Sequence, residues 1–144
     1  MSKDQGRVVV VPCSGIGKPS GSVSREAAYE LCESLRPQKT QLVALSKLVL
    51  GDAATRETVA RTPCVAIDGC QQMCASKMVK KSGGTVIHAV AVLDAFRRHR
   101  ELKAEGIAEL NDAGRKLARV MAQEMADTVD AIASAEAAKG ESHA

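Results

Sequence analysis

The chain is predicted to be an α/β protein with a mostly parallel four-stranded sheet, helices on both faces of the sheet, and a long C-terminal helix. Short apolar runs alternate with segments of helical periodicity, which is typical of parallel strands joined by helical crossovers. A run of four valines near the start of the chain indicates a strand buried on both faces. In the last third of the chain, the apolar residues recur with the period of a helix.

The composition limits the size of the fold and the classes of function. A length of 144 residues suits one domain with one core. Aromatic residues make up only 1% of the chain, so the core must consist of aliphatic side chains and methionine. This scarcity argues against a protein that binds single-stranded nucleic acid by stacking on its bases.

Basic residues are grouped in two places although the net charge is only +3. The groups are Lys77 with Lys80 and Lys81, and the segment 97–100. Such groups are typical of solvated helix faces, so we do not expect nucleic acid as a partner. The competing interpretation is a patch that binds anions or nucleic acid, whose binding would weaken with salt.

The first third of the chain predicts two strands and a helix between them. Arg7–Pro12 is the valine-rich strand, and a loop rich in Gly, Ser and Pro follows it. We expect a helix over 25–35, capped by a serine before it and ended by Pro37. A second strand over 41–45 then leads into irregular chain that ends at Gly51.

The middle of the chain predicts two further strands. Asp52 is a suitable cap for a helix that runs through Ala60. The third strand is 63–68, and we expect the next helix to begin near Cys70 and to end before a Gly-Gly pair. The fourth strand is 85–93, which is rich in β-branched residues.

The C-terminal part predicts one amphipathic helix over 111–133. Its apolar residues are spaced by three, one, four, four and three positions, and they are Leu117, Val120, Met121, Met125, Val129 and Ile132. This stripe packs on the sheet of its own domain or across a homodimer. No linker divides the chain, so we expect an α/β domain over 1–110, extended by this helix and followed by a flexible tail over 134–144.

Three cysteines follow the ends of two predicted strands. Cys13 follows the first strand, and Cys70 and Cys74 follow the third. If these strands are neighbours, their ends are about 5 Å apart, and loops at the carboxyl edge could bring the thiols around one ion. A helix that began near Cys70 would place Cys70 and Cys74 on one face, within reach of a zinc ion at about 2.3 Å. The competing interpretation is that they are small buried hydrophobic residues.

Residues next to these thiols could shape the metal site, and the two remaining cysteines are expected to lie outside it. Gly69 would let the chain turn sharply after the third strand, and Asp68 would orient a ligand or bind the metal itself. Cys64 begins the third strand, about 20 Å along an extended chain from Cys70, so we expect it at the far end of the sheet. Cys32 lies in a predicted helix and is expected to be buried.

The loop after Cys13 contains Gly15, Gly17 and Lys18. It lacks the spacing of a Walker phosphate loop. Pro19 stands where small tyrosine phosphatases and arsenate reductases carry the arginine that clamps phosphate. A tight turn whose backbone amides cradle an anion fits this loop, with Lys18 as a point charge. The alternative to metal binding is therefore a thiol-dependent oxidoreductase or transferase that uses Cys13 beside this loop.

Several of these motifs together resemble the DGC-domain family, which is described as small zinc-binding proteins of largely unassigned role. The resemblance covers Val8 to Gly84. It rests on Pro12-Cys13-Ser14-Gly15-Ile16-Gly17-Lys18, Gly21-Ser22-Val23, Arg25-Glu26-Ala27-Ala28-Tyr29, Gly51-Asp52, Ile67-Asp68-Gly69-Cys70 and Cys74-Ala75.

The resemblance implies metal binding by Cys13, Cys70 and Cys74. Family members often carry a further cysteine after the second strand, but residues 42–51 contain none. Three thiolates leave one position at a zinc ion open to water, substrate or another protein group. An iron–sulfur cluster is the alternative cofactor.

We therefore expect a cytoplasmic metal-binding protein, with zinc as the metal and a metal ion as its partner. No apolar run approaches the roughly 18 residues of a membrane span, and no secretory signal is visible, so no membrane partner is expected. Five cysteines without an export signal suggest a reducing compartment, where grouped thiols serve metals or redox chemistry. The sequence predicts no catalytic residue, and whether the protein is an enzyme stays open.

Overall fold

The sheet has four strands, all parallel, in the order β2-β1-β3-β4. A computed structural model describes residues 7–13, 18–69, 72–106 and 109–142, with side chains described to residue 138. The strands are β1 (Val8–Pro12), β2 (Thr40–Leu42), β3 (Cys64–Asp68) and β4 (Val86–Ala91). The predicted α/β class and the parallel sheet are confirmed.

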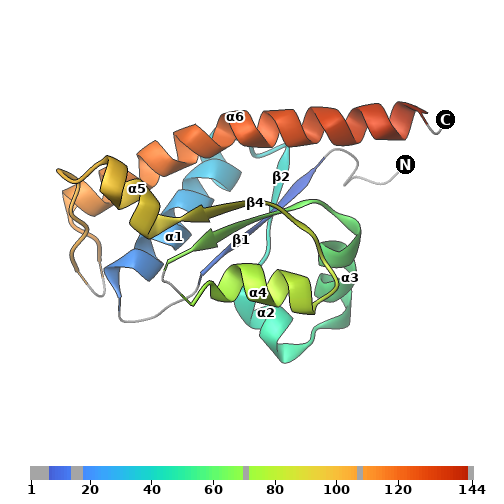
Figure 1. Cartoon of the computed structure of the whole chain (residues 1–144), viewed down its shortest axis with the longest axis horizontal. Coiled ribbons are helices and arrows are strands. Elements are labelled where there is room, and N and C mark those ends of the chain that lie inside the picture. The colour runs from blue at the N-terminus through green and yellow to red at the C-terminus, as the bar shows by residue number, and fades with distance from the viewer. Residues whose placement is uncertain (1–6, 14–17, 70–71, 107–108, 143–144) are drawn as a thin grey trace.

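Two layers of helices cover the sheet (Figure 1). On one face lie α1 (Pro19–Tyr29) with its π-helical continuation η1 (Glu30–Leu35), α5 (Val92–Arg98) and α6 (Asp112–Ser142), and on the other lie α2 (Leu45–Leu50), α3 (Ala53–Arg61) and α4 (Cys74–Lys81). Because side chains alternate along a strand, Val8 and Val10 of β1 join the first core, whereas Val9 and Val11 join the second.

The long α6 packs its apolar stripe on the sheet of its own chain. Leu117, Met121 and Val129 are almost completely buried, and α1 is the main neighbour of this helix. The stripe therefore closes the first core, which agrees with one of the two predicted uses of this helix. The helix is longer than the predicted segment, since it continues from residue 133 to Ser142.

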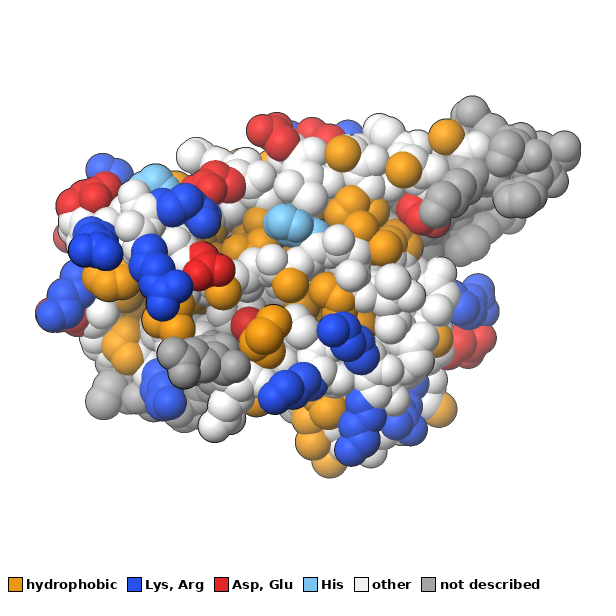
Figure 2. Space-filling view, in the orientation of Figure 1, with side chains coloured by type: hydrophobic (Ala, Val, Ile, Leu, Met, Phe, Trp, Pro, Cys, Tyr) orange, Lys and Arg blue, Asp and Glu red, His pale blue; other side chains and the backbone are white. Residues whose placement is uncertain are grey.

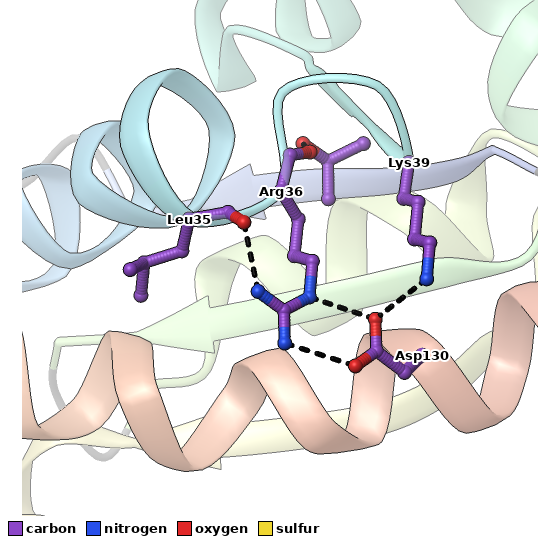
Figure 3. Close-up of polar contacts among 5 residues, drawn as sticks. Leu35, Arg36, Lys39 and Asp130 are labelled. Carbon is purple, nitrogen blue, oxygen red and sulfur yellow. Dashed lines mark hydrogen bonds and ion pairs between the residues drawn. The ribbon is translucent and has the colours of Figure 1, made fainter.

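An ion cluster joins α6 to the chain between η1 and β2 (Figure 3). Arg36 meets both carboxylate oxygens of Asp130, with Nε 2.7 Å from Oδ1 and Nη2 2.9 Å from Oδ2. Lys39 Nζ lies 3.0 Å from Oδ1. These contacts, with that of Arg36 first, lower the pKa of Asp130 to about 2.

Two helices differ from the sequence prediction near the N-terminal half. The first helix begins at Pro19 rather than at residue 25, because proline suits the first helical turn, where its missing N–H costs nothing. The segment 45–50, expected to be irregular, forms α2, and the predicted second strand shortens to three residues. The Asp52 cap is confirmed, since its Oδ2 accepts a hydrogen bond from the Thr55 backbone N–H at 3.0 Å.

The fourth strand is also shorter than predicted, because α5 begins at Val92. Within this region two of the basic residues form ion pairs: Arg97 with Asp94, and Arg98 with Glu124. Figure 2 shows acidic and basic side chains interspersed at this end of the molecule. The basic segment 97–100 thus includes cations that form ion pairs with acids on α5 and α6. Among the described residues, no helix combines the length and the hydropathy that a membrane span requires.

Candidate functional site

The carboxyl ends of β1 and β3 lie side by side at one edge of the sheet. Pro12 of β1 pairs with Ile67 of β3, and the Cys13 N–H donates to the Ile67 carbonyl oxygen at 2.8 Å. The chain goes from β1 to β2 on one side and later to β3 on the other, so the strand order reverses between β1 and β3. In open parallel sheets, ligands bind beyond the carboxyl ends of the strands at such a switch point.

Cys13 is held at this edge by backbone contacts on two sides. It is 5% exposed, and the Ser24 hydroxyl of α1 lies 2.8 Å from its carbonyl oxygen. The same hydroxyl lies 2.7 Å from the Gly21 carbonyl oxygen and donates to one of the two acceptors. Cys13 is therefore fixed between β3 and the first turns of α1.

Asp68, the last residue of β3, caps α4. Its carboxylate is buried, and Oδ1 accepts hydrogen bonds from the backbone N–H groups of Ala75 at 2.9 Å and Ser76 at 3.4 Å. Oδ2 accepts from the Ser76 hydroxyl at 2.6 Å. A carboxylate in this position satisfies the unpaired donors of a helix N-terminus. Both oxygens are thus engaged, so the geometry favours a positioning role for Asp68 over direct metal binding.

Cys74 is the first residue of α4, so the prediction that this helix begins near Cys70 was wrong. Met73 adopts a left-handed conformation with φ of 54°, and it is the one non-glycine residue with positive φ among those described. Because Gln72 and Met73 lie before the helix, Cys74 and the residue four positions earlier are not one turn apart on α4. The predicted shared helix face therefore does not exist for Cys70 and Cys74. The Cys74 side chain is half-buried, with its Sγ 4.0 Å from the Oε1 of Gln72.

Gly69 allows the N-terminus of α1 to approach the chain that leaves β3. A Cβ atom at this position would lie 3.0 Å from the Ser20 carbonyl oxygen and 3.1 Å from the Gly21 Cα. The chain bends at Gly69, as predicted, but its φ is not positive, so close packing is what requires glycine here. The N-termini of α1 and α4 and the ends of β1 and β3 therefore converge on one region.

The structure describes half of the predicted site residues. Cys13, Cys74 and Lys18 are described, whereas Cys70, Gly15 and Gly17 lie outside the described residues. Lys18 occupies the N-cap position of α1, where its side chain is exposed and its carbonyl oxygen accepts from the Gly21 N–H at 3.1 Å. No group of three His, Cys, Asp or Glu side chains suited to a metal occurs within the described part. The trio of thiols stays a prediction.

Of the other two described cysteines, Cys64 lies away from this edge, as expected, whereas Cys32 is less buried than expected. Cys64 is completely buried at the start of β3, and its Sγ lies 3.3 Å from the Thr62 carbonyl oxygen. Burial raises the pKa of Cys64 to about 12, so it stays a thiol at neutral pH. Cys32 lies half-buried in η1, and burial raises its pKa as well.

Sequence reasoning missed two residues that shape this region. Ser76 completes the cap around Asp68, and Ser24 ties α1 to the end of β1. Ser76 follows Asp68 by eight positions, so the usual search for a cap directly before a helix does not find the pair. Ser24 precedes the predicted start of the first helix and therefore fits a cap in the sequence, but it lies within α1 and its hydroxyl faces the strand end.

Comparison with protein families gives one result. The model of the DGC domain matches residues 9–113, which run from β1 into the first turn of α6. Comparisons with curated proteins and with solved structures find no match.

Proposed function

The chain belongs to the DGC-domain family, and on this basis we propose that it binds a metal ion through cysteine thiolates at the carboxyl ends of β1 and β3. The proposed metal is zinc, and the proposed ligands are Cys13, Cys70 and Cys74. The role is metal handling, metal sensing or a structural link between the two strand ends. The family membership supports metal binding, and the pairing of the ends of β1 and β3 supports this place in the fold.

The observation that carries the proposal is the pairing of the two strand ends. The hydrogen bond from Cys13 to Ile67 places one cysteine directly beside the end of β3. In the sequence, Cys70 follows the end of β3 by two residues. Cys74 is held near that end because the Asp68 carboxylate, the last side chain of β3, accepts hydrogen bonds from the first turn of α4. Two remote parts of the chain thus supply cysteines to one edge of the sheet.

The local environment suits thiolates. Cys74 begins a helix, and the positive end of the helix dipole stabilises negative charge there. Three thiolates hold zinc at about 2.3 Å and leave a fourth position for water, substrate or another protein group. Asp68 would then act as the residue that positions Cys74, as partners of metal ligands often do.

Elemental analysis of tag-free protein purified under reducing, anaerobic conditions tests this proposal. We expect about one equivalent of zinc per chain and no visible colour. Cys13→Ser, Cys70→Ser and Cys74→Ser should each lower the metal content, whereas the matched control Cys32→Ser should retain it, since Cys32 lies in η1 away from this edge. Strong visible absorbance would indicate the alternative, an iron–sulfur cluster. Less than about half an equivalent of any transition metal would contradict the proposal.

The second candidate is the thiol-dependent enzyme that uses Cys13. Its support comes from the sequence, in which Cys13 and Lys18 flank the glycine-rich loop, so that an anion bound by this loop would lie near the thiol. The 5% exposure of Cys13 favours metal binding instead, because a nucleophile must be reached by its substrate. An alkylation profile of metal-free protein separates the two. One cysteine that reacts much faster than the others at neutral pH would support the enzyme, and uniformly slow cysteines would exclude it.

A further inference from the structure

A hollow lies at the same edge of the sheet, on the side of β1 that faces β2. Its volume is about 460 Å³, and Pro12 at the end of β1 forms part of its lining. The remaining walls come from α1, from β2 with the chain after it, and from α3. Of the proposed metal ligands that the structure describes, neither Cys13 nor Cys74 lines it. The volume is in the range of sites for small molecules.

The charged side chains of this pocket favour an anion. Lys47 and Arg25 line the pocket together with one acid, Asp52. The carboxylate of Asp52 is engaged in capping α3, since it accepts from both the N–H and the hydroxyl of Thr55. The side chain of Lys47 is exposed and forms no ion pair within the described chain. The described lining thus carries two cations and one anion. The ammonium of Lys47 is near enough to Asp52 to contribute to the lowered pKa of that carboxyl, but it forms no ion pair with it and is exposed to a ligand.

One polar group of the lining lacks a partner. The amide oxygen of Gln41 in β2 is buried, and it has no hydrogen-bond partner among the described residues. A buried acceptor without a partner is uncommon in native proteins and calls for an explanation. A hydroxyl or amino group of a ligand could donate to this oxygen.

Apolar groups complete the lining, among them Val43, Leu45 and the ring of Tyr29. From these features we infer that the pocket binds a small organic anion, with a carboxylate or phosphate group facing Lys47 and a hydroxyl or amino group facing Gln41. The bound molecule would lie at the end of β1, one residue before Cys13. The inference stands on the pocket alone and does not depend on the metal.

The chain offers a direct readout of this pocket. Tyr29 lines it, and the chain contains no second tyrosine and no tryptophan. Tyrosine fluorescence therefore reports on this site alone. The tag-free full chain is titrated at low salt with succinate, malate, aspartate and glycerol 3-phosphate. We expect a saturable change in fluorescence with malate, aspartate or glycerol 3-phosphate, and weaker binding of succinate, which has no hydroxyl or amino group. The two arms distinguish a carboxylate from a phosphate.

Two variants test the contacts. Lys47→Gln should weaken binding at least about tenfold, as expected for the loss of a hydrogen bond to a charged group. The matched control Lys80→Gln removes the same charge from the last turn of α4, outside the pocket, and should change affinity by less than about twofold. Gln41→Leu should abolish the preference for malate over succinate. Circular dichroism verifies that each variant is folded.

Three results would overturn the inference. The first is the absence of a saturable change with all four probes up to about 10 mM, which corresponds to binding weaker than about 3 kcal/mol. The second is an equal loss of affinity in Lys47→Gln and Lys80→Gln, which would indicate a general effect of net charge. The third is an unchanged preference for malate in Gln41→Leu.

Discussion

Replacing Asp68 with asparagine tests whether the charge and the two acceptor oxygens of this side chain stabilise α4, because the volume of the side chain stays nearly the same. Asparagine has nearly the same shape, but it carries no charge and presents an amide N–H₂ in place of one oxygen. The Ala75 N–H, at 2.9 Å from Oδ1, can still donate to the asparagine oxygen. The Ser76 hydroxyl, at 2.6 Å from Oδ2, loses its acceptor and must rotate to accept instead.

The expected cost follows from these contacts. Loss of a capping side chain costs about 1 kcal/mol, and loss of a hydrogen bond to a charged group costs about 1.5–3 kcal/mol. Because one bond survives and the serine can rotate, we expect Asp68→Asn to lower the free energy of unfolding by about 2 kcal/mol. Asp68→Ala leaves the buried donors of Ala75 and Ser76 without this acceptor, so we expect about 3–4 kcal/mol.

Urea denaturation of metal-free protein measures this cost, since a bound metal would add its own stabilisation. The midpoint should fall while the slope of the transition stays unchanged. Asp112→Asn is the matched control, because Asp112 is an exposed acid in the first turn of α6 and should contribute less than about 0.5 kcal/mol. The reasoning is refuted if Asp68→Asn is within about 0.5 kcal/mol of the unmodified chain, or if its cost does not exceed that of Asp112→Asn.

Three further predictions follow from the packing and the pKa shifts. The carboxylate of Asp130 has its pKa lowered to about 2, chiefly by Arg36, so its stabilisation is complete above about pH 4 and is lost as the pH falls through 2. Because solvent screens this partly exposed ion pair, we expect Asp130→Asn to remove about 1 kcal/mol of the pH-dependent free energy of unfolding. Urea denaturation of both proteins at a series of acidic pH values measures this difference, and the same pH dependence in both would contradict the prediction. Gly69→Ala should cost about 1–3 kcal/mol in thermal unfolding, because its Cβ would press against the Ser20 carbonyl oxygen at 3.0 Å, and an unchanged melting temperature would argue against this contact. Cys64, with a pKa raised to about 12, should resist iodoacetamide at pH 8 until the protein unfolds, and rapid labelling in the native state, measured by mass spectrometry, would show that its burial is wrong.

The sheet could be predicted because its strands have a clear signal. The valine run of β1 and the apolar run of β3 are buried on both faces, and such strands have few polar residues. The short helices gave no such signal. Leu45 and Leu48 of α2 follow a strand closely, and Val92 of α5 continues the apolar run of β4, so local periodicity could not distinguish helix from strand over these lengths.

The site was predicted at the level of strand ends and missed at the level of its local geometry. The alternation of strands and helices placed Cys13 and Cys70 at strand ends, but that the two strands are neighbours was only a condition of the prediction. The structure shows that β1 and β3 are neighbours. The start of α4 was misplaced because the left-handed conformation of Met73 depends on the surrounding structure, since methionine has no intrinsic preference for it. The cap between Asp68 and Ser76 joins residues across a loop, and short-range sequence patterns do not detect it.

X-ray absorption at the zinc edge of metal-loaded protein identifies the atoms bound to the metal and so examines the proposed thiolate site itself. We expect a shell of about three sulfur atoms at about 2.3 Å, which loses sulfur in Cys13→Ser, Cys70→Ser and Cys74→Ser. A shell made only of nitrogen and oxygen at about 2.0–2.2 Å, or a sulfur shell unchanged in all three variants, would contradict it.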